Sequence, residues 1–102
     1  MRFTVTYLGT SAAIPTTERG LAATAIQRGS RTLLIDCGEG TQRQLRRSAV
    51  GLVEVDGICF THFHGDHYLG VIGLLKSYDL LGRRKPLQVW GPAGVTEVFT
   101  MI

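Results

Sequence analysis

All three histidines of the chain lie within six residues of one another, in the stretch Thr61-His62-Phe63-His64-Gly65-Asp66-His67. Imidazole nitrogens and a carboxylate oxygen, with no thiolate pair nearby, are the ligands expected of a catalytic zinc-type centre rather than a closed structural one. A lone histidine or aspartate is more often a core, turn or cap residue. The four together, directly after an apolar run, favour a metal site.

The spacing of the motif suits ligands that converge. Side chains two apart on an extended backbone point the same way, so His62 and His64 are predicted to share one side. Asp66 and His67 are adjacent and would diverge from a regular strand or helix, so we expect the chain to turn at Gly65. These four donors would serve either one ion or two. With two ions, each would need further ligands or water.

Beyond the donors themselves, the motif His-x-His-x-Asp-His resembles the signature of the metallo-β-lactamase superfamily. The longer stretch Thr61 to Gly70, with Gly73-Leu74-Leu75, is similar to the ribonuclease Z family of tRNA 3′-processing endonucleases. Two upstream segments carry the same resemblance, Leu8-Gly9-Thr10-Ser11-Ala12-Ala13-Ile14-Pro15-Thr16 with Arg19, and Asp36-Cys37-Gly38-Glu39-Gly40-Thr41-Gln42. The resemblance therefore covers nearly the whole chain.

The resemblance implies an α/β fold, the metallo-β-lactamase-like αβ/βα sandwich, of which residues 1–102 would supply roughly the N-terminal half. The domain is accordingly expected to be incomplete. In the family the remaining metal ligands lie further along the chain. Here no histidine follows His67, and Asp79 is the only later aspartate, so those ligands have no counterpart in this sequence.

The resemblance also implies a reaction, the hydrolysis of a phosphodiester in precursor tRNA to release a 3′ trailer. Two zinc ions, or manganese, would assist it. His62 and His64 would hold one ion, Asp66 and His67 the other, and Asp66 would also accept the proton of the attacking water. Asp36 would orient a ligand, although an aspartate that ends a strand is equally a turn or cap residue. A homodimer is expected.

Other functions stay open on the sequence. The histidine-rich loop also suits another hydrolase of the superfamily, such as a phosphodiesterase. A different class of function is a catalytically incomplete metal-binding fragment that dimerises through exposed sheet and helix faces. A plain nucleic-acid-binding module is disfavoured because no aromatic residues are interleaved with the basic ones.

Composition sets the remaining limits. A chain of 102 residues with 44% hydrophobic content suits one small domain, and no stretch is apolar enough to span a membrane. The two cysteines, Cys37 and Cys59, are too few for a disulfide framework, which favours the cytoplasm. The formal charge of +3 includes two basic groups, and charge alone favours solvated faces over nucleic-acid contacts. The groups are Arg43-Arg46-Arg47 and Arg83-Arg84-Lys85.

The hydrophobic pattern predicts five strands and three helices. Phe3, Val5 and Tyr7 alternate with threonines, which is typical of a half-buried strand. Strands are also predicted at 22–28 and 31–36, joined by a Gly29-Ser30 hairpin, at 55–61 and at 87–90, with a loop over 9–20. Helices are predicted at about 41–47, over 71–78 with a stop at Gly82, and from Val95 to the last residue, where the chain is expected to stop in mid-helix.

Overall fold

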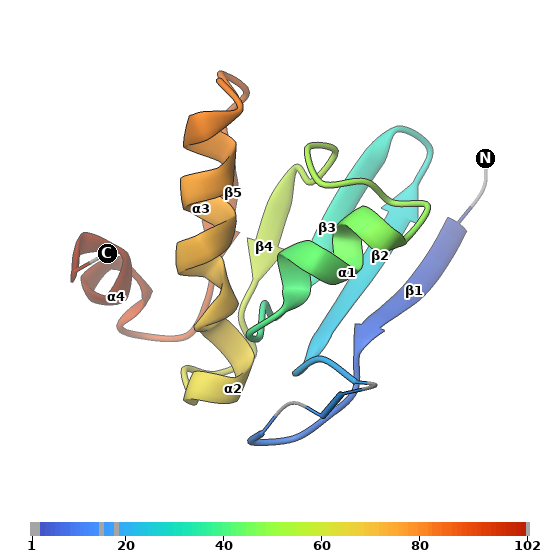
Figure 1. Ribbon diagram of the computed structural model, residues 1–102. Coiled ribbons are helices and arrows are strands. Elements are labelled where there is room, and N and C mark those ends of the chain that lie inside the picture. Colours follow the sequence, from blue (N-terminus) through green and yellow to red (C-terminus); the bar gives the residue numbers. More distant parts are fainter. Residues whose placement is uncertain (1–2, 15, 18, 102) are drawn as a thin grey trace.

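The computed structural model describes residues 3–14, 16–17 and 19–101, and within them one sheet of five strands in the order β1-β2-β3-β4-β5 (Figure 1). The first three strands pair antiparallel, and β3, β4 and β5 pair parallel. The strands are β1 (Phe3–Gly9), β2 (Ala23–Arg28), β3 (Arg31–Ile35), β4 (Gly57–Cys59) and β5 (Gln88–Trp90).

The helices are α1 (Thr41–Arg47), α2 (Gly65–Tyr68), α3 (Gly70–Leu80) and α4 (Val95–Met101). The chain crosses from β3 to β4 through α1, and from β4 to β5 through α2 and α3. Both crossings step in the same direction across the sheet. Because such crossings are almost always right-handed, they put α1 and α3 on the same face, as Figure 1 shows. No helix in the described part of the chain is long and apolar enough to cross a membrane.

The face under α1 and α3 carries the core, and we call it the covered face. Ala25, Leu34 and Ile58 lie side by side on neighbouring strands, and each is 0% exposed. Leu45 of α1 and Leu74 of α3 pack over them and are equally buried. The burial of these apolar side chains is the main favourable contribution to the fold.

The opposite face, the open face, is also apolar but far more exposed. Phe3, Val5 and Tyr7 are 64%, 45% and 74% exposed. Val5 lies in register with Ile26, and Ile26 with Leu33, so a row of apolar side chains crosses this face. The half-buried strand predicted from Phe3, Val5 and Tyr7 is confirmed as a strand, and these three apolar side chains lie on its exposed side. Alternation shows which side chains share a face, whereas the placement of the helices decides which face is covered.

Most predicted elements are confirmed within one or two residues. Gly29 adopts a φ of 60° in the β2–β3 hairpin, and Gly82 a φ of 75° just after α3, as their turn and stop roles require. The strand predicted over 55–61 is shorter, because only Gly57–Cys59 pairs on both sides. The predicted loop 9–20 begins later, since β1 reaches Gly9, and its Pro15 lies outside the described residues, as does Ile102.

Candidate metal centre

The histidine-rich loop lies at the carboxyl ends of the two parallel strands β3 and β4. Asp36 follows β3 directly, and its N–H donates to the carbonyl of Cys59 at 2.8 Å, which extends the pairing by one step. The φ of Asp36 is 64°, in the left-handed region that aspartate tolerates better than most residues. This conformation turns the Asp36 side chain towards the residues that follow β4.

The Asp36 carboxylate joins three groups of the loop. Its Oδ1 accepts the backbone N–H of Thr61 at 2.8 Å, and its Oδ2 accepts the Thr61 hydroxyl at 2.8 Å. The same Oδ2 lies 2.8 Å from Nδ1 of His67. Asp36 is only 5% exposed, so these bonds are shielded from water. The predicted orienting role of Asp36 thus has a hydrogen-bonding basis in the structure.

These bonds fix the proton on each ring. A carboxylate only accepts, so Nδ1 of His67 carries the hydrogen. The Thr61 hydroxyl gives its own hydrogen to Asp36, so its oxygen accepts from Nδ1 of His62, 2.9 Å away. When the ring is neutral, this leaves Nε2 as the nitrogen with the electron pair that a metal would use. A carboxylate or hydroxyl behind a histidine is the usual way in which proteins orient a ring for metal binding.

The four predicted ligands lie together. The ring centroids of His62 and His64 are 4.5 Å apart, and those of His62 and His67 are 3.9 Å apart. Asp66 Oδ2 lies 3.4 Å from Nε2 of His67. The shared side of His62 and His64 follows from the extended backbone, as predicted. Phe63 between them packs its ring against those of Phe60 and Tyr68.

The turn that brings Asp66 and His67 back is made by a helix. His64 is extended, with φ −69° and ψ 144°, and α2 begins at the next residue. Gly65 is absent from the glycines with positive φ, so the turn does not depend on glycine's left-handed conformations. The expectation that a helix would make Asp66 and His67 diverge is wrong, because the single turn of α2 keeps their polar atoms within 3.4 Å.

Asp66 has a further contact that the sequence did not reveal. The backbone N–H of Ala13 donates to Asp66 Oδ2 at 3.1 Å, from the loop between β1 and β2. This N–H holds the pKa of Asp66 below its ordinary value, and charge on His67 acts in the same direction. A backbone donor 53 residues away leaves no signal in residue types. Thr61, by contrast, has a signal in the sequence, since it is a polar residue directly after a buried strand.

The chemistry of the donor set fits a catalytic metal, while the present arrangement is closed. Within the described residues, no three histidine, cysteine, aspartate or glutamate side chains surround a point where an ion would sit. The histidine rings instead lie against one another. Zinc ligands at about 2.0–2.1 Å need room for the ion between the nitrogens, so metal binding would require these rings to move apart.

The sequence is similar to those of known proteins over most of its length. The sequence model of the metallo-β-lactamase superfamily matches residues 16–88. Ribonuclease Z of Myxococcus xanthus is 51% identical over 88 residues, which are 86% of this chain and 28% of that protein. Ribonuclease Z of Methanosarcina acetivorans is 43% identical over 93 residues, 91% of this chain and 30% of that protein. The chain thus spans about 30% of the length of these relatives.

Solved structures agree with the sequence comparison. The short form of human tRNase Z superposes with a TM-score of 0.86 at 39% identity, over 95% of this chain and 38% of that one. The metallo-β-lactamase fold protein YhfI of Bacillus subtilis superposes with a TM-score of 0.83 at 24% identity, over 95% of this chain and 39% of that one, which supports the fold alone. The predicted α/β fold class is confirmed, and the chain belongs to the metallo-β-lactamase superfamily.

Proposed function

We propose that this chain is part of a zinc-dependent endoribonuclease that removes 3′ trailers from precursor tRNA by phosphodiester hydrolysis. The observation that carries the proposal is the pair of histidines held through one buried carboxylate. Asp36 bonds His67 directly and reaches His62 through Thr61, so that both Nε2 atoms are free to bind metal. The similarity to ribonuclease Z proteins supplies the substrate class.

The proposed roles of the four loop residues follow the predicted ligand set. His62 and His64 would hold one zinc ion, and Asp66 and His67 a second, with manganese as an alternative metal. The ions, when bound, lower the pKa of water and neutralise charge on the phosphate. Asp66 would accept the proton of the attacking water. Asp36 acts as a positioning residue.

Residues 1–102 would form the N-terminal part of a metallo-β-lactamase-like domain. Two observations support this assignment. The chain spans about 30% of the length of its ribonuclease Z relatives, and the apolar open face offers a surface for further protein to cover. We further propose that the complete protein is cytoplasmic and forms a homodimer.

A second candidate function is favoured by the same two observations. A chain that lacks the later ligands of the family would be a metal-binding fragment without catalytic activity. Another hydrolase of the superfamily, such as a phosphodiesterase, is the other alternative, since one fold hosts many reactions. Both differ from the first proposal in what they do to precursor tRNA.

The test is cleavage of a 3′-extended precursor tRNA by this chain with added zinc or manganese, beside an Asp66→Ala variant. If residues 1–102 suffice for catalysis, the parent releases one discrete trailer. Loss of the proton acceptor should slow release by roughly 10²–10⁴-fold, while tRNA binding survives. Small phosphodiesters and thioesters, assayed in parallel, measure the preference for RNA.

Each result assigns the chain to one candidate. Turnover retained in Asp66→Ala would refute the role of that residue, and faster hydrolysis of small phosphodiesters than of precursor tRNA would favour the other hydrolase. If the parent binds zinc, measured by equilibrium dialysis, and cuts none of these substrates, the chain is the catalytically incomplete fragment.

A further inference from the structure

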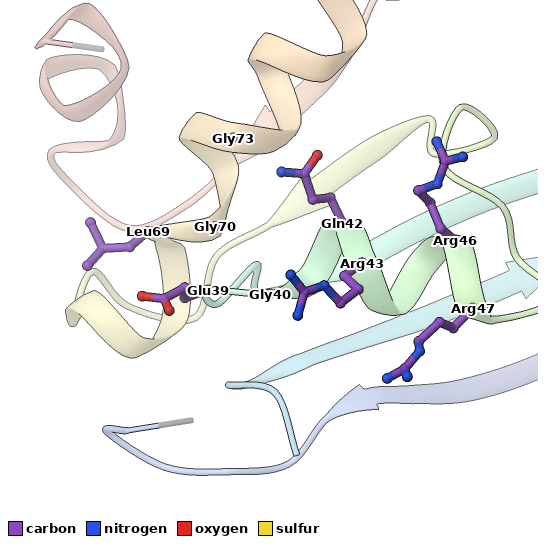
Figure 2. A pocket seen from close by; sticks show the side chains of 9 residues that line it. All are labelled: Glu39, Gly40, Gln42, Arg43, Arg46, Arg47, Leu69, Gly70 and Gly73. Atoms are coloured by element: carbon purple, nitrogen blue, oxygen red, sulfur yellow. The ribbon is translucent and has the colours of Figure 1, made fainter. Parts of the chain in front are cut away.

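A cleft of about 790 Å³ lies between α1 and the start of α3, beside the histidine-rich loop (Figure 2). Arg43, Arg46 and Arg47 line it from α1, and Leu69 and Gly70 line it on the side nearest the loop. A smaller hollow of about 230 Å³ on the other side of α1 shares Arg43 and Arg47. These two arginines therefore border two adjoining depressions, as part of a basic group that the proposed chemistry does not use.

The three arginines have no ionic partner within the part of the chain that the structure describes. The ion pairs found there involve His67 and Lys85 instead, and no side-chain hydrogen bond reaches any of the three arginines. Arg46 and Arg47 follow Arg43 by three and four residues, so each is a helix neighbour of Arg43 and repels it, whereas the side chains of Arg46 and Arg47 point in different directions (Figure 2). The helix dipole favours cations at the last turn, which accounts for Arg46 and Arg47 and leaves Arg43, near the first turn, unexplained.

The cleft is tied to the metal loop by backbone contacts. The N–H of Cys37 donates to the carbonyl of His67 at 2.8 Å, and the N–H of Gly70 donates to the carbonyl of Cys37 at 3.0 Å. A Cβ atom at Gly70 would lie 2.0 Å from the carbonyl oxygen of Gly38, so any larger residue would force the two segments apart. The cleft wall and the loop are therefore held in one fixed arrangement.

The lining chemistry points to phosphate rather than to bases. The planar guanidinium group of arginine matches phosphate oxygens with paired hydrogen bonds. None of the residues lining the cleft is aromatic, so the cleft offers no platform on which bases would stack. Contacts to phosphate position a nucleic acid without reading its sequence. Glu39, the one acidic residue among the described residues of the lining, would weaken such binding.

We propose that this cleft binds the phosphate backbone of the RNA substrate next to the site of cleavage. The proposal rests on the proposed function for the substrate class and adds a location and three residues, Arg43, Arg46 and Arg47. A backbone that enters the histidine-rich loop would pass Leu69 and continue between α1 and α3.

The test measures binding of a 3′-extended precursor tRNA in EDTA, so that no cleavage occurs, over a range of salt concentrations. The variant is Arg43→Gln/Arg46→Gln/Arg47→Gln, which keeps good helix formers. We expect roughly tenfold weaker binding or more at 0.1 M salt. The slope of log affinity against log salt should become shallower by about 2, since each lost phosphate contact removes about 0.7–0.9.

Two further variants make the test specific. Arg84→Gln removes one positive charge, as Arg43→Gln does, but from an exposed site in the other basic group, and it should leave the slope unchanged. Glu39→Gln removes the acidic residue of the lining and should tighten binding. Circular dichroism confirms that each variant is folded, and Arg43→Gln alone replaces the triple variant if the latter unfolds.

Three results would overturn the proposal. One is an unchanged slope in the folded arginine variants, and another is an equal loss in Arg84→Gln. The third is competition by polyglutamate as effective as that of RNA of equal charge, which would indicate an acidic protein partner. Inorganic phosphate that competes only at far higher concentration than RNA supports a backbone site over a site for free phosphate.

The outcome is separate from that of the proposed function. Normal cleavage by arginine variants that bind RNA like the parent would remove the cleft proposal and leave the nuclease proposal intact. Arginine-dependent RNA binding by a chain that cleaves no substrate would leave the cleft proposal intact and remove the nuclease proposal.

Discussion

The two faces of the sheet differ in what covers them and hardly at all in the residues that they present. The covered face carries Ala25, Leu34 and Ile58, fully buried under α1 and α3. The open face carries Val5, Ile26 and Leu33 in a row, with Val5 45% exposed. On an ordinary one-sided sheet the second face would be polar. An apolar second face is typical of a sheet that is buried on both sides, or of an interaction surface.

Shortening one leucine on each face of the same strand tests this difference between the two faces. Leu34 is 0% exposed on the covered face, whereas Leu33 points to the open face and is half-buried. We expect Leu34→Ala to lower the free energy of unfolding by about 2–5 kcal/mol, since it loses buried surface and leaves a cavity. Leu33→Ala should cost roughly 1 kcal/mol or less. Urea unfolding of both variants measures the difference.

Equal losses in the two variants would mean that the open face is already covered in solution. Repeating the unfolding measurements at lower protein concentration then shows whether a second copy of the chain covers the open face. If a second copy of the chain lies there, the cost of Leu33→Ala falls as the protein is diluted, because stability that comes from association depends on concentration.

The open face also shows where sequence reasoning fails. The alternation in β1 correctly predicts a strand, but it does not show that Thr4 and Thr6 face the helices while Phe3, Val5 and Tyr7 do not. Period alone fixes which residues share a side. The side that is covered depends on the right-handed crossings through α1 and α3, which are a property of the whole chain.

The candidate metal ligands were easier to predict from the sequence than the face of the sheet that the helices cover. Its donors are contiguous, so residue type and local spacing suffice to group His62, His64, Asp66 and His67. The orienting role of Asp36 was predicted only from the family resemblance, because Asp36 lies 31 residues from His67, the histidine that it bonds. The hydrogen bond from the Ala13 N–H could not be predicted from the sequence. Almost every residue has a backbone N–H, and only the folded loop brings that of Ala13 to Asp66.

The two cysteines offer a chemical comparison of the faces. Burial raises the pKa of the Cys37 thiol to about 12, from an ordinary 9.0, and its exposure is 0%. That shift alone leaves about a thousandfold less of the reactive thiolate at pH 8. Cys59 is half-buried and lies in register with Trp90 and Ile35 on the open face.

We expect N-ethylmaleimide to label Cys59 in the folded chain and Cys37 only after unfolding in urea. Mass spectrometry of the digested protein locates the label. Faster labelling of Cys37 would contradict the burial on the covered face. Protection of Cys59 at high protein concentration, lost on dilution, would show that the open face is an interface between copies of the chain.

The smallest expected effect comes from the ion pair between Lys85 and Asp56, at the edge of a hollow on the open face. The Lys85 ammonium, followed by the N–H of Thr32, lowers the pKa of the Asp56 carboxyl in the folded chain. A lowered folded pKa stabilises the protein fully above the unfolded value of about 3.9, and this contribution is lost as the pH falls through the folded value.

Asp56→Asn should therefore destabilise by less than about 1 kcal/mol at pH 7, the usual range for exposed pairs, with the deficit constant down to about pH 5 and shrinking below pH 4. Urea unfolding of parent and variant at each pH measures it, and Lys85→Gln should show the same pH dependence. A deficit that grows as the pH falls would reverse the assigned sign. A loss of unfolding free energy well above the range of exposed ion pairs would mean that protein covering the open face shields Lys85 and Asp56 from water. The strength of this ion pair therefore also reports whether the open face is covered.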